Sequence, residues 1–225
     1  MGIILGIVAF ALSLIVSWRF KSKVKKYSVI TLRNGLTGKE IAEKMLKDNN
    51  IYDVKVISVE GQLTDHYNPL DKTVNLSADV YSGNSVISAA VAAHECGHAV
   101  QHAQAYTWLT LRSRLVPIVS ISSQYVQWIL LAGILLISRF PNLLLIGIMV
   151  FALTTVFSFV TLPVEFDASR RALAWLNNTH MLDREEHESS KDALKWAAMT
   201  YVIAALSSLA TLMYYVMIYT GRSRD

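Results

Sequence analysis

The chain has 225 residues, of which 53% are hydrophobic and 17% are charged, with a formal net charge of +4. This low charged fraction and the positive mean hydropathy exclude an ordinary soluble domain, in which about 25% of residues are charged. The abundance of aliphatic and aromatic side chains excludes disorder, and a single cysteine excludes a disulfide scaffold. No motif supports nucleic-acid binding, and basic flanks of membrane segments account for the positive charge.

Four apolar blocks are spaced along the chain, and each approaches the ~20 residues that a membrane-spanning helix needs. They cover residues 3–18, 115–137, 143–162 and 197–219. The first block is short and could be read as a signal peptide, but its basic cluster follows the apolar run, as in an uncleaved anchor. Only residues 138–142 separate the second block from the third, so we expect these two to form a helical hairpin.

The positions of lysine and arginine predict the orientation of the chain in the membrane. The basic cluster after the first block belongs in the cytosol, which places residues 19–114 and 163–196 inside and the turn 138–142 outside. The tail, with Arg222 and Arg224, would then lie outside, which mildly violates the rule. We therefore expect a multi-pass protein of the cell membrane whose two long polar segments face the cytosol.

The first polar segment is expected to fold as a small α+β unit. Thr37 followed by Glu40 is a capping-box pattern that begins a helix, and alternating apolar residues further along predict strands. The expected elements are, in chain order, a helix over 35–48, a strand over 51–59, a hairpin over 63–76 with its turn at 68–71, and a helix from 86 to about 104.

The second polar segment offers fewer signals. We expect a helix after the third apolar block, then a loop over residues 177–192, with Asp183 and Glu186 able to cap a helix that leads into the fourth block. The domains predicted from the whole chain are an N-terminal membrane anchor (1–20), a cytosolic α+β unit (21–114), a transmembrane hairpin (115–162), a cytosolic helix and loop (163–196), a transmembrane helix (197–219) and a tail (220–225).

One motif in the predicted helix over 86–104 carries chemistry, the sequence His94-Glu95-Cys96-Gly97-His98. Residues four apart lie on one face of a helix, so the two imidazoles could bind one Zn²⁺. Glu95 could then reach a zinc-activated water without binding the metal and act as general base. The alternative is a pair of core histidines, but ionisable groups in an alanine-rich helix are costly without a partner.

A third ligand is needed to complete a catalytic zinc site. The metzincin pattern fails, because Gln101 and Gln104 stand where a glycine and a third histidine are required. His102 lies one turn beyond His98, but three ligands along a straight helix would be spread over about 12 Å and converge poorly. We therefore interpret His102 as a polar residue of the helix surface.

Glu165 is the stronger candidate for the third ligand. The hairpin of the second and third apolar blocks crosses the membrane twice and returns Glu165 to the side that carries the two histidines. Asp167 is close in the chain, but two residues along a helix point it to another side. The alternative role for Glu165 is a surface carboxylate that pairs with Arg170 or Arg171, an interaction worth only ~0–1 kcal/mol.

The chain resembles the YugP-type neutral zinc metallopeptidases of bacterial membranes. The matching segments are 63–67, 76–77, 80–81, 91–102, 111–113, 116–117 and 161–172. The layout is also similar to that of the HtpX-type and CAAX prenyl proteases, in which a helical hairpin is followed by a glutamate ligand that opens an E-x-x-x-D motif. Glu165 falls on that ligand, while Ser169 stands where the aspartate would be, so the residue that supports one imidazole must differ here. The resemblance implies a gluzincin-like site.

The expected fold is thus a mainly α membrane protein with about four transmembrane helices and a small α+β zincin-like cytosolic unit. The expected function is that of a zinc metalloendopeptidase that holds one Zn²⁺ per chain through His94, His98 and Glu165, with Glu95 as base. It would cleave membrane or juxtamembrane proteins at the cytosolic face of the bilayer. Candidates to stabilise the oxyanion are His66, Tyr67, Arg170 and His180.

Two further expectations concern residues beside the motif. The strand at residues 73–76 could pair with an extended substrate by β-addition. Cys96 occupies a variable position of the motif, so we interpret it as a small buried packing residue and not as a nucleophile; its unpaired state fits a reducing compartment.

Two alternative functions stay open. A site-2-type intramembrane protease would carry the motif within a span and a distant Leu-Asp-Gly ligand motif, which this sequence lacks, and His94 precedes the second apolar block by about twenty residues. A non-catalytic metal-binding scaffold or transporter is the other alternative. No acidic residue or histidine lies inside the last three apolar blocks, so an ion pathway is poorly supported.

Overall fold

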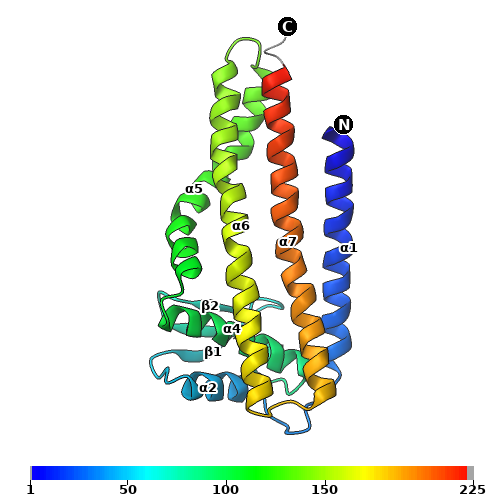
Figure 1. Cartoon of the computed structure of the whole chain (residues 1–225), viewed down its shortest axis with the longest axis vertical. Coiled ribbons are helices and arrows are strands. Elements are labelled where there is room, and N and C mark those ends of the chain that lie inside the picture. Colours follow the sequence, from blue (N-terminus) through cyan, green and yellow to red (C-terminus); the bar gives the residue numbers. More distant parts are fainter. Residues whose placement is uncertain (1, 222–225) are drawn as a thin grey trace. The chain divides into compact units, whose positions relative to one another are not determined.

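The protein is mainly α-helical with one small sheet (Figure 1). The computed structural model describes residues 2–221, with side chains from residue 6 onward. The elements are α1 (Gly2–Ser28), α2 (Gly38–Asp48), β1 (Lys55–Val59), β2 (His66–Asn68), β3 (Thr73–Ser77), α3 (Ala78–Tyr81), α4 (Val86–Ala103), α5 (Thr107–Leu135), α6 (Pro141–Asn178) and α7 (Arg184–Gly221).

These elements form two compact units. The apolar stretches of α1, α5, α6 and α7 make one unit, and the segments Ser17–Leu109 and Pro163–Met199 make the other. Helices α6 and α7 therefore contribute to both. The chemistry-bearing residues singled out by the sequence all lie in the second unit.

Three of the described helices, α5, α6 and α7, are long and apolar enough to cross a membrane. The expectation of about four is not met. The first apolar block is helical within α1, but the side chains of residues 2–5 lie outside the described part of the chain. The described uncharged part of α1, residues 6–18 before Arg19, is by itself shorter than a span. The tail 222–225 also lies outside the described residues.

The expected hairpin of apolar helices is present in the first unit. Helix α5 ends at Leu135 and α6 begins at Pro141. The two helices approach closely near this turn, since a Cβ added at Gly133 would lie 2.6 Å from the Cα of Leu144. Buried side chains of both helices pack there: Val126, Leu130, Leu144 and Ile148.

The second unit contains a three-stranded sheet in the order β1-β3-β2. The expected hairpin is confirmed, because β2 pairs antiparallel with β3, while β1 pairs parallel with the other side of β3. The expectation that residues 73–76 add a substrate strand is wrong, because both sides of β3 are already paired. The edges available to another strand belong to β1 and β2.

Helices α2 and α4 pack together in the second unit. Thr37 and Glu40 form the predicted capping box at the start of α2, with the Thr37 side chain accepting from the backbone of Glu40. A hydrophobic core joins these helices to the sheet and to α6 and α7; its largest fully buried apolar side chains are Ile41, Met45, Val74, Leu76, Val86 and Leu176.

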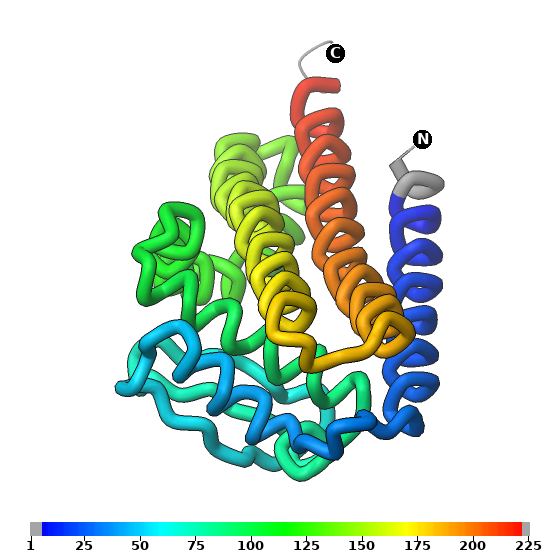
Figure 2. Tube along the Cα trace, turned by 60° about the horizontal axis from the view of Figure 1, so that its bottom comes forward, coloured from blue at the N-terminus to red at the C-terminus, as the bar shows by residue number. Residues whose placement is uncertain are grey.

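The loop expected over residues 177–192 is wrong. Helix α6 continues to Asn178 and α7 begins at Arg184, so a short turn joins them. The predicted cap at this place is confirmed, because the Asp183 carboxylate accepts from the Glu186 backbone and Glu186 accepts from that of Asp183. The polar residues that suggested a loop lie on a helix whose other face buries Ser190, Ala193 and Leu194. Figures 1 and 2 show the lower parts of α6 and α7 side by side.

Candidate metal centre

Three metal-binding side chains converge in the second unit. His94 and His98 lie one turn apart on α4, and Glu165 lies on α6. The Nε2 atoms of His94 and His98 are 3.4 Å and 3.6 Å from Oε2 of Glu165. One donor atom from each residue lies within 4.8 Å of the others. The structure thus brings together the three residues that the sequence predicted as ligands.

Small residues let α4 and α6 approach closely enough for this group to form. A Cβ at Gly97 would lie 2.6 Å from the carbonyl oxygen of Ala168, closer than real Cβ contacts permit. Both residues are in the helix interior, and Ala93, Ala168 and Ala172 are fully buried beside them. Gly97 occupies a position that the motif leaves open, but here the close approach of the α6 backbone requires a glycine.

The two histidines face Glu165 through the same ring atom. On His98 the other ring nitrogen, Nδ1, lies 3.0 Å from Oε1 of Gln101, and on His94 it lies 3.1 Å from Oγ of Ser169. Such partners on the far nitrogen orient histidine ligands in metal sites. Ser169, which stands where the related enzymes carry an aspartate, thus contacts one imidazole.

Gln101 was missed as a site residue by the sequence analysis, which considered it only as a failed metzincin position. It lies three residues after His98, on the same helical face, and it is fully buried. A glutamine at that spacing inside an apolar helix was the signal that could have found it. Its amide nitrogen donates to the carbonyl oxygen of Val164 at 2.8 Å and to Oδ2 of Asp167 at 2.9 Å.

Asp167 does not join the three-residue group. Its carboxylate accepts from Gln101 and pairs with Arg170 and Arg171, the two arginines that the sequence offered as alternative partners of Glu165. Glu165 itself is only 2% exposed and faces the imidazoles. The two carboxylates, two residues apart on α6, therefore have different surroundings.

Glu95 is also buried, at 8% exposure. Burial raises the pKa of Glu95 to about 7, although the neighbouring His94 works in the opposite direction. A carboxylate with such a pKa is able to accept and return a proton near neutral pH.

The candidates for oxyanion stabilisation are dispersed. The Tyr67 hydroxyl lies 2.7 Å from Nδ1 of His102, and burial raises the pKa of Tyr67 to about 12. The imidazole of His66 is exposed and lies 2.7 Å from the carbonyl oxygen of Thr64, Arg170 pairs with Asp167, and His180 lies in the turn after α6. Their assignment stays a prediction.

Two further residues of the motif helix, His102 and Cys96, lie where the sequence predicted, the first on the surface and the second in the core. His102 is exposed and is outside the group of three. The Cys96 thiol is fully buried, 3.5 Å from the carbonyl oxygen of Ala42, and burial raises its pKa well above the ordinary value. A buried thiol of this kind is a poor nucleophile.

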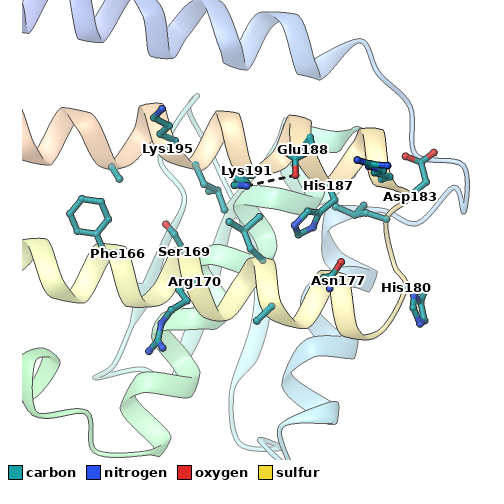
Figure 3. A pocket seen from close by; sticks show the side chains of 16 residues that line it. Phe166, Ser169, Arg170, Asn177, His180, Asp183, His187, Glu188, Lys191 and Lys195 are labelled. Atoms are coloured by element: carbon teal, nitrogen blue, oxygen red, sulfur yellow. Dashed lines mark ion pairs between the residues drawn. The ribbon is translucent and has the colours of Figure 1, made fainter.

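A cavity of about 950 Å³ lies between the second-unit parts of α6 and α7. Figure 3 shows Phe166, Ser169 and Lys195 toward one end, and His180 and Asp183 at the turn between the helices. Because Ser169 also contacts His94, the cavity wall includes a residue of the candidate metal centre.

Two comparisons with known proteins found similar sequences. Residues 2–220 match a family described as "putative neutral zinc metallopeptidase". The chain is 42% identical over 224 residues to the "putative membrane protease YugP" of Bacillus subtilis (strain 168), with 99% of each chain covered. No solved structure matches it, so the zincin-like character of the α+β unit stays a prediction.

Proposed function

Since the chain belongs to the family described as "putative neutral zinc metallopeptidase", we propose that it is a multi-pass membrane zinc endopeptidase that cleaves membrane or juxtamembrane proteins. The observation that carries the proposal is the convergence of His94, His98 and Glu165. Two imidazole nitrogens and one carboxylate oxygen are the protein ligands of many catalytic zinc sites, which leave a further position open. The residues present therefore fit one zinc ion.

A zinc ion held there would supply Lewis acidity, which polarises a carbonyl group and lowers the pKa of water. Glu95, next to the group and buried, accepts the proton of the attacking water as its oxygen bonds to the peptide carbonyl carbon. Glu95 then returns that proton to the leaving nitrogen as the C–N bond breaks. One carboxylate thus acts as base and then as acid, which suits its pKa of about 7.

The position of the site supports a substrate at the membrane surface. Glu165 is on α6, shortly after an apolar stretch long enough to cross a membrane. We propose that the site faces the cytosol, which follows from the basic residues after the apolar part of α1. The cavity beside Ser169 offers room for part of the substrate.

This location differs from that expected of a site-2-type protease, which carries its motif inside a span. The three described helices that could cross a membrane do not include α4, where His94 and His98 lie. The two histidines therefore lie outside the described helices that could cross a membrane, and Glu165 follows the apolar stretch of α6, which does not favour a site-2-type arrangement.

The test uses the full chain in detergent, with bound zinc measured by elemental analysis and cleavage measured on fluorescently labelled casein and a single-span protein with a cytosolic tail. Glu95→Gln should keep one zinc per chain and lose about 10²–10⁴-fold in cleavage rate. Glu165→Ala should lose zinc and activity together, while Glu43→Gln, at an exposed carboxylate of α2, should change neither.

Two outcomes would contradict the proposal. Full cleavage by Glu95→Gln would reject the mechanism. A wild-type chain that binds zinc but cleaves neither substrate, with the same behaviour in Glu95→Gln, would favour a non-catalytic metal-binding scaffold.

A further inference from the structure

The side chain of Gln101 is fully buried between α4 and α6 and makes three hydrogen bonds. Its Oε1 faces Nδ1 of His98, and its Nε2 donates to the Val164 carbonyl oxygen and to Asp167. An amide side chain has one end that only accepts and one that only donates. The direction in which this amide points therefore matters for the histidine.

The partners of the amide nitrogen determine that direction. A backbone carbonyl oxygen can only accept, and the Asp167 carboxylate is held in its ionised, accepting form by Arg170 and Arg171. Both partners therefore require the NH₂ group of Gln101. If the amide were reversed, its oxygen would meet two acceptors, and the buried carbonyl and carboxylate would each lose a donor.

With the amide so directed, Oε1 is the atom that faces His98, and it can only accept. Nδ1 of His98 must then carry the proton, which leaves the lone pair on Nε2, the atom 3.6 Å from Oε2 of Glu165. A neutral imidazole binds a metal through its unprotonated nitrogen. The tautomer set in this way is the one that directs an available lone pair toward the candidate metal position.

We propose that Asp167 is a positioning residue that acts through Gln101 to fix His98 in its Nδ1-protonated form, ready to bind a metal before the metal arrives. The inference rests on the proposed function only in that the ion is taken to be zinc. Asp167 contacts neither imidazole in this arrangement; its effect on His98 passes through the amide.

The second histidine provides a comparison within the same site. Nδ1 of His94 lies 3.1 Å from the Ser169 hydroxyl, which can either donate or accept. Ser169 supports the ring but does not choose its tautomer. The protein therefore fixes the tautomer of His98 but not that of His94. Ser169→Ala is for this reason a matched control for substitutions at Gln101.

The chain of contacts extends beyond Asp167. Arg171 pairs with Asp167 and also donates to Oε1 of Gln104, at 2.6 Å, and its guanidinium lies over the Tyr106 ring. The carboxylate that directs Gln101 is thus itself held between charged partners. Removing a residue that hydrogen-bonds to a metal ligand commonly weakens metal binding by about 10–100-fold. We expect an effect of that order here.

The first experiment observes the tautomer directly in the metal-free full chain in detergent, by ¹⁵N chemical shifts of labelled histidine. His98→Gln assigns the signals. The wild type should show His98 protonated at Nδ1. Asp167→Asn offers an amide that can donate to a reversed Gln101, so a mixture of the two His98 tautomers should appear, whereas Ser169→Ala should leave the His98 signals unchanged.

The second experiment measures zinc affinity by competition with a chelator, with thermal unfolding as the check that each variant is folded. Gln101→Leu, which removes the acceptor, should weaken zinc binding by about 10–100-fold.

The inference is overturned if His98 stays purely Nδ1-protonated in Asp167→Asn, or if folded Gln101→Leu binds zinc as tightly as the wild type. Should Gln101→Leu not fold, the tautomer in Asp167→Asn decides. Neither measurement depends on peptide cleavage. A chain that shows these effects but cleaves nothing would contradict the proposed peptidase and leave this inference standing.

Discussion

The backbone of Gly97 meets the backbone of Ala168 so closely that no side chain could be placed between them; a Cβ at Gly97 would come within 2.6 Å of the Ala168 carbonyl oxygen. Gly97 directly precedes His98, and Ala168 lies three residues beyond Glu165. The contact between helices α4 and α6 therefore sets the distance between the imidazoles and the carboxylate.

Gly97→Ala should weaken the metal site and the fold together. The obstacle is backbone, which cannot move aside as a flexible side chain can, so α6 must shift away from α4. We expect a loss of about 1–3 kcal/mol in the free energy of unfolding and weaker zinc binding, measured by thermal unfolding and chelator competition. Gly6→Ala, where nothing lies within 4 Å of the added Cβ, is the control and should be neutral. Equal behaviour of the two variants would contradict the steric argument.

Removal of zinc should lower the stability of the folded chain. A ligand at 100 times its dissociation constant stabilises the state it binds by about 2.7 kcal/mol, so the unfolding temperature should rise on adding zinc and fall again with a chelator. In Glu165→Gln this response should shrink, because the amide that replaces the carboxylate carries no charge to attract the ion. If zinc raised the unfolding temperature of both proteins equally, Glu165 would not be a ligand.

Cleavage should decline as the pH falls through a value at or below about 7. Glu95 must be deprotonated to act as base, burial raises its pKa to about 7, and the charge of a bound metal ion would lower it. Below that pKa, kcat/KM should fall about tenfold per pH unit. The measurement is kcat/KM against pH, with zinc occupancy followed in parallel because protonated imidazoles release metal. An acid limb lying above pH 8 would contradict this role of Glu95.

Cys96→Ala should retain zinc binding and cleavage. The thiol is buried, its pKa is raised well above the ordinary value, and its nearest polar partner is the carbonyl oxygen of Ala42 rather than a residue of the metal group. In the folded wild type, a thiol reagent should react slowly, and denaturant should restore the reaction. Rapid inactivation of the native chain by such a reagent, prevented in Cys96→Ala, would show that the thiol is accessible.

Local patterns in the sequence were sufficient for much of the fold. The capping pairs Thr37 with Glu40 and Asp183 with Glu186 begin helices where predicted, because each pair satisfies backbone N–H groups that a helix leaves free. The two histidines share a face because helical periodicity alone puts them there. The return of Glu165 was predicted from two closely spaced apolar blocks, each long enough to cross a membrane.

Other features depend on packing between distant segments and were not readable in this way. The polar residues 184–192 resembled a loop, although their buried face, which includes Ser190, meets a neighbour that the local sequence does not reveal. Gln101 gained its role from Val164 and Asp167 on another helix.

The order of the elements along the chain has a consequence for biosynthesis. The two imidazoles on α4 are made first, and the carboxylate on α6 follows only after α5 and the first half of α6 have been synthesised. A nascent chain released from the ribosome before residue 163 holds two of the three donors, and two donors retain a zinc ion less well than three. A truncated product of this kind therefore lacks the carboxylate that completes the three-residue group.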